Sequence, residues 1–293
     1  MSNKKTIIYA FLVMLLWGSL FPMVKLGYGA YGIKTTGDIL YFAGARFVVC
    51  GIIICLYSAL TDRSSFKTIN KSTLLPIILS GLIAITLHYG FTYTGLMLTD
   101  SSKTAILKQI GVLVYICFSF LFFKDDRPSV KKVLAALMGI SGIAVINAGP
   151  AGVCFSIGDI LIIGASCCTV ISNVISKKVF SSVKPVTATG VAQLFGGIVL
   201  LAAGKMAGGS MSFHIGQSLL FICICLASVI SYCIWYTVVK QADLSGLFII
   251  KFSEPVFAAV FGALILNENI FKLQYLLAFI LIGGSIFITN KKQ

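Results

Sequence analysis

Charged residues are scarce in this chain: Asp, Glu, Lys and Arg together make up 11% of its 293 residues. A soluble domain carries about 25% charged residues, because its surface faces water. Here 58% of the residues are hydrophobic and the mean hydropathy is +1.00. The shortage of charge excludes an ordinary soluble domain and indicates a protein whose solvent is mostly lipid.

Metal-binding and redox motifs are also missing. The chain has two histidines, and its nine cysteines include no C-x-x-C pair, so a Cys/His zinc cluster cannot be completed at the usual spacing. Every cysteine except Cys154 lies in an apolar run, which favours buried thiols over a disulfide framework. The G-x-x-x-x-G-K-S/T phosphate loop is absent as well. We therefore expect no metal, no cofactor and no nucleotide hydrolysis.

Acidic residues are the rarest charged class, with nine Asp and Glu against 23 Lys and Arg, a net charge of +14. Such an excess can indicate nucleic-acid binding, but here the basic residues are not pooled in one stretch. They stand at the ends of apolar runs, where Lys and Arg set membrane topology and meet anionic headgroups. We therefore expect membrane lipid, and no nucleic acid, as a partner.

Ten apolar segments follow one another along the chain. Each has roughly the length needed to cross about 30 Å of hydrocarbon as a helix. A helix is expected because lipid offers no hydrogen-bond partners to backbone groups. The first segment lacks a small-x-small cleavage site, so we expect a mature helix rather than a signal peptide. The segments are 7–26, 39–60, 74–96, 104–123, 133–149, 158–176, 186–204, 218–239, 245–266 and 273–290.

The basic residues between the segments predict the orientation. If the N-terminus lies inside, 15 of the 23 basic residues fall in inside connections, and three, Lys34, Lys205 and Lys272, fall outside. This is a strong positive-inside bias. We therefore expect a multi-pass protein of the inner or plasma membrane with both termini in the cytoplasm.

The chain also repeats itself weakly. Residues 125–147 and 267–290 share an acid after an apolar run, an amphipathic entry, and an apolar helix with a late glycine. A shift of 142 residues places Asp126 on Glu268, Gly142 on Gly284 and Tyr93 on Trp235.

The two repeats are predicted to insert in opposite orientations. A unit of five helices that starts inside ends outside, so its copy must begin outside, as in many secondary transporters. We expect a first unit over 6–148, a connector over 149–157 and a second unit over 158–290. The substrate site is then expected near the midplane between them.

Several short motifs resemble a known family. Trp17-Gly18-Ser19 with Phe21-Pro22, and Ala45-Arg46-Phe47, resemble elements of the EamA-type transporters of the drug/metabolite transporter superfamily. Glu254-Pro255-Val256-Phe257-Ala258-Ala259, followed by Glu268, resembles the element of that family's second half. The resemblance implies a ten-helix carrier, commonly an exporter of metabolites, amino acids or toxic compounds.

The first half departs from this pattern. It has Gln109 to Leu113 where the second half has Lys251 to Pro255, so we expect segment 104–123 to lack both the acid–proline pair and its kink. An Asp pair, Asp125 and Asp126, replaces the Glu after that segment. We therefore expect the chemistry to be weighted toward segment 245–266.

Four charged residues fall inside predicted membrane helices: Arg46, Lys108, Lys251 and Glu254. Inserting such a charge at the bilayer centre costs about 2.5–3.5 kcal/mol, so each of these residues is expected to have a partner or a function. Lys251 and Glu254 share a helix face and form either an ion pair or a substrate or proton site. Lys108 either faces inward or snorkels to the interface. Three positive charges against one negative predict a substrate that carries a carboxylate.

Polar and aromatic residues supply the remaining candidates. Tyr89 and Ser231 lie deep and are expected to line a cavity. Trp17, Tyr93 and Trp235 either line it or serve packing and the interfacial belt. His88 either relays protons or is satisfied by a neighbouring hydroxyl. Tyr115 is a further candidate for lining the cavity, because it shares a helix face with Thr104, Lys108 and Gly111. Pro22 and Pro255 are predicted to kink their helices.

These features predict a secondary transporter that works by alternating access. We expect an exporter of small metabolites such as amino acids or organic anions, with a proton or another ion as a candidate for coupling. An efflux carrier for cationic drugs is the first alternative and a gated channel is the second. An enzyme is not expected, because no H-E-x-x-H motif or intramembrane aspartate pair is present.

Overall fold

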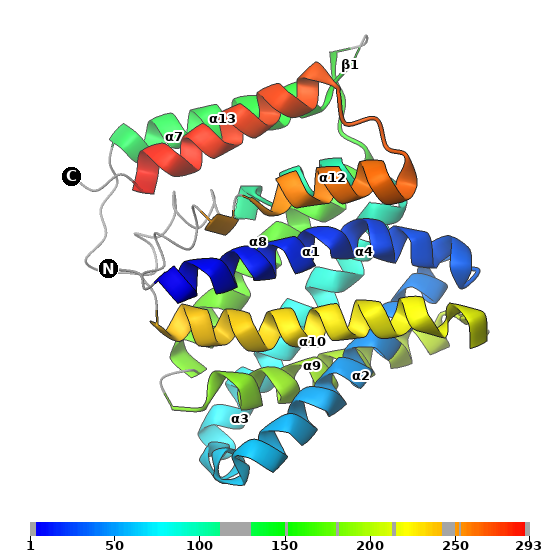
Figure 1. Ribbon diagram of the computed structural model, residues 1–293, viewed down its shortest axis with the longest axis vertical. Helices are drawn as coiled ribbons and strands as arrows, with labels where there is room; N and C mark the ends of the chain where they lie inside the picture. Colours follow the sequence, from blue (N-terminus) through cyan, green and yellow to red (C-terminus); the bar gives the residue numbers. More distant parts are fainter. Residues whose placement is uncertain are drawn as a thin grey trace.

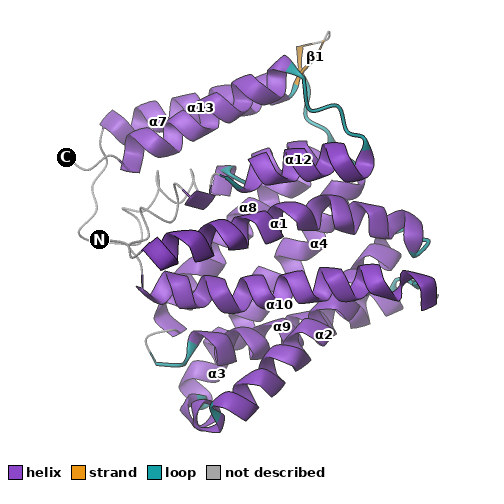
Figure 2. Ribbon diagram, in the orientation of Figure 1, coloured by secondary structure: helices purple, strands orange, loops and turns teal. Residues whose placement is uncertain are grey.

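The structure is a computed structural model that describes residues 4–111, 130–149, 152–179, 182–212, 215–241, 250–251 and 253–290. The described residues form helices that lie side by side in one bundle, with a single two-residue antiparallel pair between β1 (Ala148–Gly149) and β2 (Gly152–Val153) (Figures 1 and 2). Tyr115, Asp125 and Asp126 lie outside the described residues.

Five helical stretches are long and apolar enough to cross a membrane. Shorter apolar helices stand between them, as the alternation of apolar runs and basic connections predicts. The chain is therefore a membrane protein with several apolar helices. The five long stretches are α1 (Lys4–Ala30), α2 (Thr36–Thr61), the composite of α3 (Lys71–Gly81), η2 (Leu82–Leu87) and α4 (His88–Met97), α9 (Pro185–Met206) and α10 (Ser218–Gln241).

The remaining elements complete the described part of the bundle. Local capping fixes some helix starts: Thr35 and Asp38 form a capping box at α2, and Asn70 and Thr73 form one at α3. The remaining elements are η1 (Arg63–Thr68), α5 (Ser101–Leu107), α7 (Val130–Ile146), α8 (Ile157–Val179), η4 (Ile215–Gln217), α12 (Glu254–Leu266) and α13 (Leu273–Asn290).

Small residues allow helices from the two halves to touch along their backbones. A Cβ atom on Gly44 of α2 would lie 2.2 Å from the backbone nitrogen of Leu201 in α9, and one on Gly197 would lie 2.6 Å from that of Val48. Glycine therefore permits the close α2–α9 pairing, which is the usual way that helices associate in lipid. α7 and α13 form a second pair, seen at the top of Figure 1.

Large apolar side chains are exposed along one face of α7 and of α13. In α13 they include Leu273, Leu276, Leu277 and Ile280, spaced three and four residues apart, with Leu273 68% exposed. In α7 they follow the same spacing. An apolar face of this size is compatible with lipid rather than with water.

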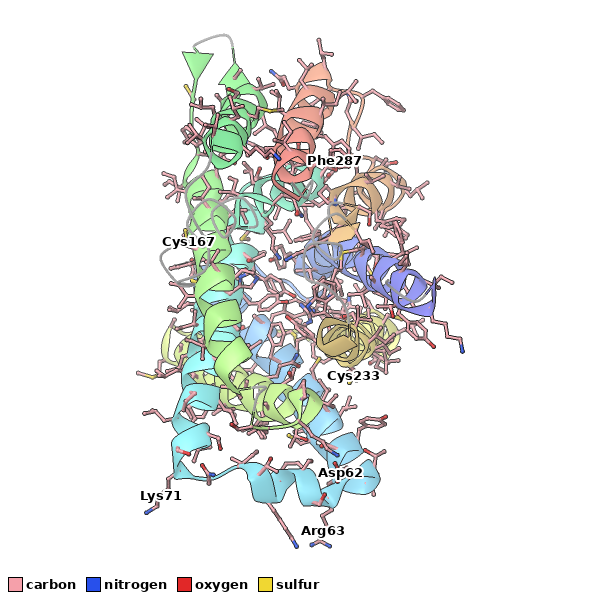
Figure 3. All side chains as sticks on the ribbon, turned by 90° about the vertical axis from the view of Figure 1, so that its left-hand side faces the viewer. Asp62, Arg63, Lys71, Cys167, Cys233 and Phe287 are labelled. Atoms are coloured by element: carbon pink, nitrogen blue, oxygen red, sulfur yellow. The ribbon has the colours of Figure 1, made fainter. Side chains whose placement is uncertain are left out.

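The two ends of the bundle can be told apart. α1 begins and α13 ends at the same edge, on the left of Figure 1, and we call this the terminal end. Figure 3 views the molecule from that side, with Asp62, Arg63 and Lys71 at its lower edge. The opposite end is called the distal end below.

The backbone corrects one prediction about kinks. The segment predicted at 104–123 was expected to be unkinked because it lacks the acid–proline pair, but α5 ends at Leu107 and a turn follows at Lys108 and Gln109. The carbonyl of Lys108 accepts a hydrogen bond from the amide of Gly111 at 3.3 Å and from Ser166 Oγ of α8 at 3.4 Å. Ser166 Oγ also donates to the carbonyl of Ile162 in its own helix at 3.1 Å, so the break coincides with a shared contact from another helix rather than with a proline.

The two predicted kink prolines behave differently from each other. Pro255 stands in the first turn of α12, directly after Glu254, where a missing amide hydrogen costs nothing. Pro22 lies inside α1, which continues through it to Ala30. A π-helical segment, η2, interrupts the composite stretch directly before His88 and Tyr89. Such segments often occur beside functional sites.

Candidate functional site: a buried arginine in an aromatic cluster

Arg46 of α2 is buried in the middle of the bundle, with 1% of its surface exposed. Its Nη2 donates a hydrogen bond to Ser228 Oγ of α10 at 2.5 Å. Its guanidinium carbon lies 4.7 Å from the ring centroid of Phe47, 5.7 Å from that of Tyr89 and 5.5 Å from that of Tyr93. No carboxylate pairs with it among the residues that the structure describes. Aromatic faces therefore solvate this cation in part, and its charge stays unneutralised.

Aromatic contacts extend from Arg46 to α1. The hydroxyl oxygens of Tyr89 and Tyr232 lie 2.5 Å apart, and the Tyr232 ring lies 5.7 Å from that of Trp17. Trp17 in turn lies 5.1 Å from Trp235. We call the whole set the central cluster: Trp17, Arg46, Phe47, Tyr89, Tyr93, Ser228, Tyr232 and Trp235.

Several donors in the central cluster have no acceptor. Trp17 Nε1, Arg46 Nε and Tyr93 Oη are buried and make no hydrogen bond within the described part of the chain. A buried donor without a partner costs about 1–3 kcal/mol, and a buried charge without a partner costs more. These three groups can donate hydrogen bonds to an acceptor that the described part of the chain does not supply.

Three further charges surround the cluster. Lys108 Nζ lies 5.0 Å from the ring centroid of Phe21, and Lys108 is within electrostatic range of Arg46, Lys251 and Glu254. Glu254 is 4% exposed at the start of α12, and no ion pair joins it to Lys251. The interior charges therefore act on one another, and of the two alternatives for Lys251 and Glu254 the ion pair is not formed.

His88 and Ser231 make local contacts. The Nδ1 atom of His88 lies 2.9 Å from the carbonyl oxygen of Ala165 and 3.0 Å from Thr169 Oγ1. A carbonyl only accepts, so Nδ1 carries the proton and holds α4 to α8. This geometry fits the satisfied histidine among the two predicted alternatives. Ser231 is fully buried, and its Oγ donates to the carbonyl of Ser228 at 3.0 Å.

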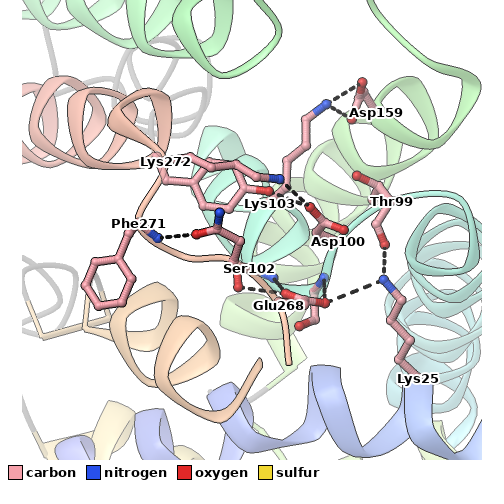
Figure 4. A network of polar contacts seen from close by, with 12 residues as sticks. Lys25, Thr99, Asp100, Ser102, Lys103, Asp159, Glu268, Phe271 and Lys272 are labelled. Carbon is pink, nitrogen blue, oxygen red and sulfur yellow. Dashed lines mark hydrogen bonds and ion pairs between the residues drawn. The ribbon is translucent and has the colours of Figure 1, made fainter. Parts of the chain in front are cut away.

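A second set of polar groups lies at the distal end (Figure 4). The carboxylate of Glu268 accepts hydrogen bonds from the amide of Ser101 at 2.8 Å, and from the amide and the hydroxyl of Ser102 at 3.1 and 2.8 Å. Lys25 Nζ lies 3.5 Å from the same carboxylate and donates to the carbonyl of Thr99 at 2.7 Å. Glu268 therefore joins α1, the start of α5 and the end of α12.

Neighbouring ion pairs extend this set. Asp100 accepts hydrogen bonds from Tyr275 Oη at 2.7 Å and from Lys272 Nζ at 3.3 Å. Lys103 lies 2.9 Å from the buried carboxylate of Asp159. Each of these contacts joins a residue before position 104 to one after position 158, so the first half of the chain is tied to the second half at this end.

Sequence reasoning found some of these residues and overlooked others. The structure brings together the predicted Trp17, Arg46, Tyr89, Tyr93 and Trp235, and it leaves Tyr115 undescribed. It adds residues that were not among the predicted site residues, although Phe47 and Glu268 stand in the family motifs. Ser228, Tyr232 and Trp235 are spaced four and three residues apart. This spacing places them on one face of α10 and could have identified Ser228 and Tyr232 from the sequence. The added residues are Phe47, Ser228, Tyr232 and, at the distal end, Lys25, Asp100, Ser101, Ser102, Lys103, Asp159, Glu268, Lys272 and Tyr275.

Comparison with known proteins places the chain among transporters. It is 26% identical to "Uncharacterized transporter YvbV" of Bacillus subtilis over 99% of this chain and 93% of that protein. It is 25% identical to an "Uncharacterized transporter" of Archaeoglobus fulgidus, with 99% of each chain covered. A solved crystal structure shares the fold with a TM-score of 0.66 at 18% identity, over 98% of this chain and 96% of that one.

A family model gives the assignment directly. The EamA-like transporter family matches this chain twice, over residues 4–148 and 156–290. The two matches together cover nearly the whole sequence, and the motifs around Trp17, Arg46 and Glu254 fall inside them. The chain therefore belongs to the EamA-like transporter family.

Proposed function

We propose that the protein is a secondary carrier that exports small metabolites bearing a carboxylate, such as amino acids or organic anions, by alternating access. Its ten helices form two inverted five-helix repeats in the inner or plasma membrane, with both termini in the cytoplasm. The central cluster binds the solute, and Glu254 is the candidate for coupling transport to an ion.

The pattern of helix contacts supports the inverted repeat. Helices that correspond under the 142-residue shift meet each other: α2 meets α9, and α7 meets α13. Contacts between helices that do not correspond occur in equivalent pairs. α1 packs against α10, and its counterpart α8 packs against α4. In the same way α1 packs against α12, and α8 packs against α5. This reciprocity is what a two-fold axis between two similar units produces.

The unneutralised charge of Arg46 is the observation that carries the proposed substrate class. A buried cation in a membrane protein is costly unless it has a partner or a function, and here its described protein partners are one hydroxyl and three aromatic rings. A carboxylate accepts two parallel hydrogen bonds from a guanidinium, which suits the free Nε of Arg46. The rings of Trp17 and Trp235, whose centroids lie 5.1 Å apart, give the site an apolar surface for the body of such a solute beside the charge.

A ligand screen tests this proposal. The purified protein is heated with amino acids, organic acids, nucleobases and lipophilic cations, since a bound ligand stabilises the state it binds. We expect carboxylates to raise the melting temperature. In the Arg46→Gln variant, the affinity for them should fall about 10- to 100-fold, because a charge-assisted hydrogen bond contributes about 1.5–3 kcal/mol.

A matched control separates the site from general charge. Arg63 is exposed at the terminal end, so Arg63→Gln removes the same charge without touching the cluster. It should leave the ligand effect intact. Lipophilic cations that stabilise the protein better than carboxylates, or a full response in Arg46→Gln, would contradict the proposal. In proteoliposomes, saturable exchange of the hit compound supports a carrier, whereas an unsaturated conductance indicates a channel.

A further inference from the structure

We propose that Glu268 is a positioning residue that holds the distal end of the bundle closed, and that its bonds to α1 and α5 must break when the carrier opens there. The proposal rests on the alternating-access function inferred above. The four residues Lys25, Ser101, Ser102 and Glu268 are called the distal latch.

The carboxylate of Glu268 is held from several sides. It receives three hydrogen bonds of 2.8 to 3.1 Å from Ser101 and Ser102, and only 8% of its side chain is exposed. Two of the donors are backbone amides at the start of α5, which have no partner within that helix. Each amide bonds to a different oxygen of the carboxylate, so removing either oxygen leaves one buried amide without an acceptor.

The backbone of α12 positions this carboxylate. α12 ends at Leu266 and is capped by Asn267, which adopts a left-handed conformation with φ of 53°. The amide of Glu268 then donates to the carbonyl of Gly262 at 3.2 Å. A Cβ atom at Gly262 would lie 2.9 Å from both Glu268 Oε2 and Ser101 Oγ. The reversed turn aims Glu268 at α5, and the glycine leaves the space that the carboxylate occupies.

The distal latch crosses the boundary between the two repeats. Lys25, Ser101 and Ser102 belong to the first family match, and Glu268 belongs to the second. The flanking pairs Asp100–Lys272 and Lys103–Asp159 cross it in the same way. Lys25 follows Trp17 by eight residues on α1, so the latch lies about 12 Å further along the helix axis than the central cluster. Separating the repeats at this end therefore breaks every one of these contacts.

An ion pair at the other end provides a control. Lys184 pairs with Asp62, also across the repeats, but both residues lie beside the α2–α9 contact, where glycines bring the two backbones together. The side chain of Lys184 is 60% exposed. This pair sits on an interface that we expect to stay closed, so removing it should not open the bundle.

Accessibility of a buried position tests the distal latch. Thr104 lies three residues after Ser101 on α5 and is fully buried, so Thr104→Cys creates a reporter just inside the latch. Intact cells are treated with a membrane-impermeant maleimide, and modification at position 104 is followed by site-resolved mass spectrometry. We expect slow labelling in this parent, and labelling about tenfold faster or more when Glu268→Gln is added. Glutamine has the same shape, but its amide group points a donor at the amides of Ser101 or Ser102.

Two further variants make the result decisive. Lys25→Gln removes a different partner of the same carboxylate and should also speed labelling, whereas Lys184→Gln should not. Equal labelling rates in the parent, Glu268→Gln and Lys25→Gln, with a lowered melting temperature, would show that Glu268 is a static helix cap and overturn the proposal. The labelling needs no solute, so a failed ligand screen leaves this result standing, and a failed latch leaves the carboxylate proposal standing.

Discussion

The hydroxyl groups of Tyr89 and Tyr232 meet at 2.5 Å, which joins α4 of the first repeat to α10 of the second. We expect Tyr89→Phe to reduce the free energy of unfolding by about 1 kcal/mol, the usual net contribution of a hydrogen bond. The measurement is thermal unfolding of Tyr89→Phe, Tyr232→Phe and the double variant. The double variant should lose less than the sum of the single losses.

Tyr57 provides the control for this pair. It is a tyrosine of α2 that is 53% exposed, so Tyr57→Phe should leave the melting temperature unchanged. Strictly additive effects of Tyr89→Phe and Tyr232→Phe would mean that the two hydroxyls contribute independently, contrary to the expectation.

The contact between α2 and α9 leads to a second prediction. Gly44→Ala introduces a Cβ atom 2.2 Å from the backbone of Leu201, so the helices must move apart. We expect a loss of about 1–3 kcal/mol of stability, as for other overpacked sites. Gly29→Ala in α1 is the matched control, because no atom lies within 4 Å of its added Cβ. Equal melting temperatures for Gly44→Ala and Gly29→Ala would refute the close contact.

Asp100 should make the distal end sensitive to acid. Burial acts to raise the pKa of its carboxyl, but the hydrogen bond from Tyr275 and the nearby Lys272 and Lys25 outweigh burial, so the pKa is lowered from its usual 3.8. A lowered pKa means that Asp100 stabilises the folded state at neutral pH, and that this contribution is lost as the pH falls through the folded value.

The corresponding measurement compares the wild type with Asp100→Asn across pH. We expect the variant to melt at a lower temperature at pH 7, and the difference to shrink below about pH 4. A difference that stays constant down to pH 3 would show that the ionised carboxylate of Asp100 does not contribute to stability.

Glu254 should weaken the positive field around the central cluster. Glu254→Gln raises the net charge of Arg46, Lys108, Lys251 and position 254 by one, so a carboxylate solute should bind more tightly and its KM should fall. Glu254→Asp keeps the charge and should keep the KM. Transport by both variants is measured at several pH values. A loss of the pH dependence in Glu254→Gln alone would assign proton coupling to this residue.

Hydropathy predicted the helical segments well because lipid leaves the backbone no other choice. The predicted ranges 7–26, 39–60 and 186–204 fall inside α1, α2 and α9. The break at Lys108 was not predictable from a proline rule, since no proline stands there and its interhelical contact is with Ser166, a residue 58 positions away. Local sequence therefore determines where helices run, and contacts between helices determine where they are interrupted.

The sequence predicted those site residues whose insertion into a membrane costs free energy. Arg46 was identified because a charged side chain inside a membrane is expected to have a partner or a function. The structure places it beside Tyr89 and Tyr93. Glu268 was singled out only as part of a family motif and as the counterpart of Asp126, and neither observation assigns it a contact. Its partners Ser101 and Ser102 are more than 160 positions away in the chain, so only the folded structure reveals their contact.

The Trp17–Trp235 contact provides an intrinsic optical reporter. These are the chain's two tryptophans, and their rings lie 5.1 Å apart inside the central cluster. The ultraviolet emission of unmodified protein excited at the indole band therefore originates at the proposed binding site. Solute titrations can be followed by quenching or spectral shift without a dye, an added cysteine or a purification tag near the cluster.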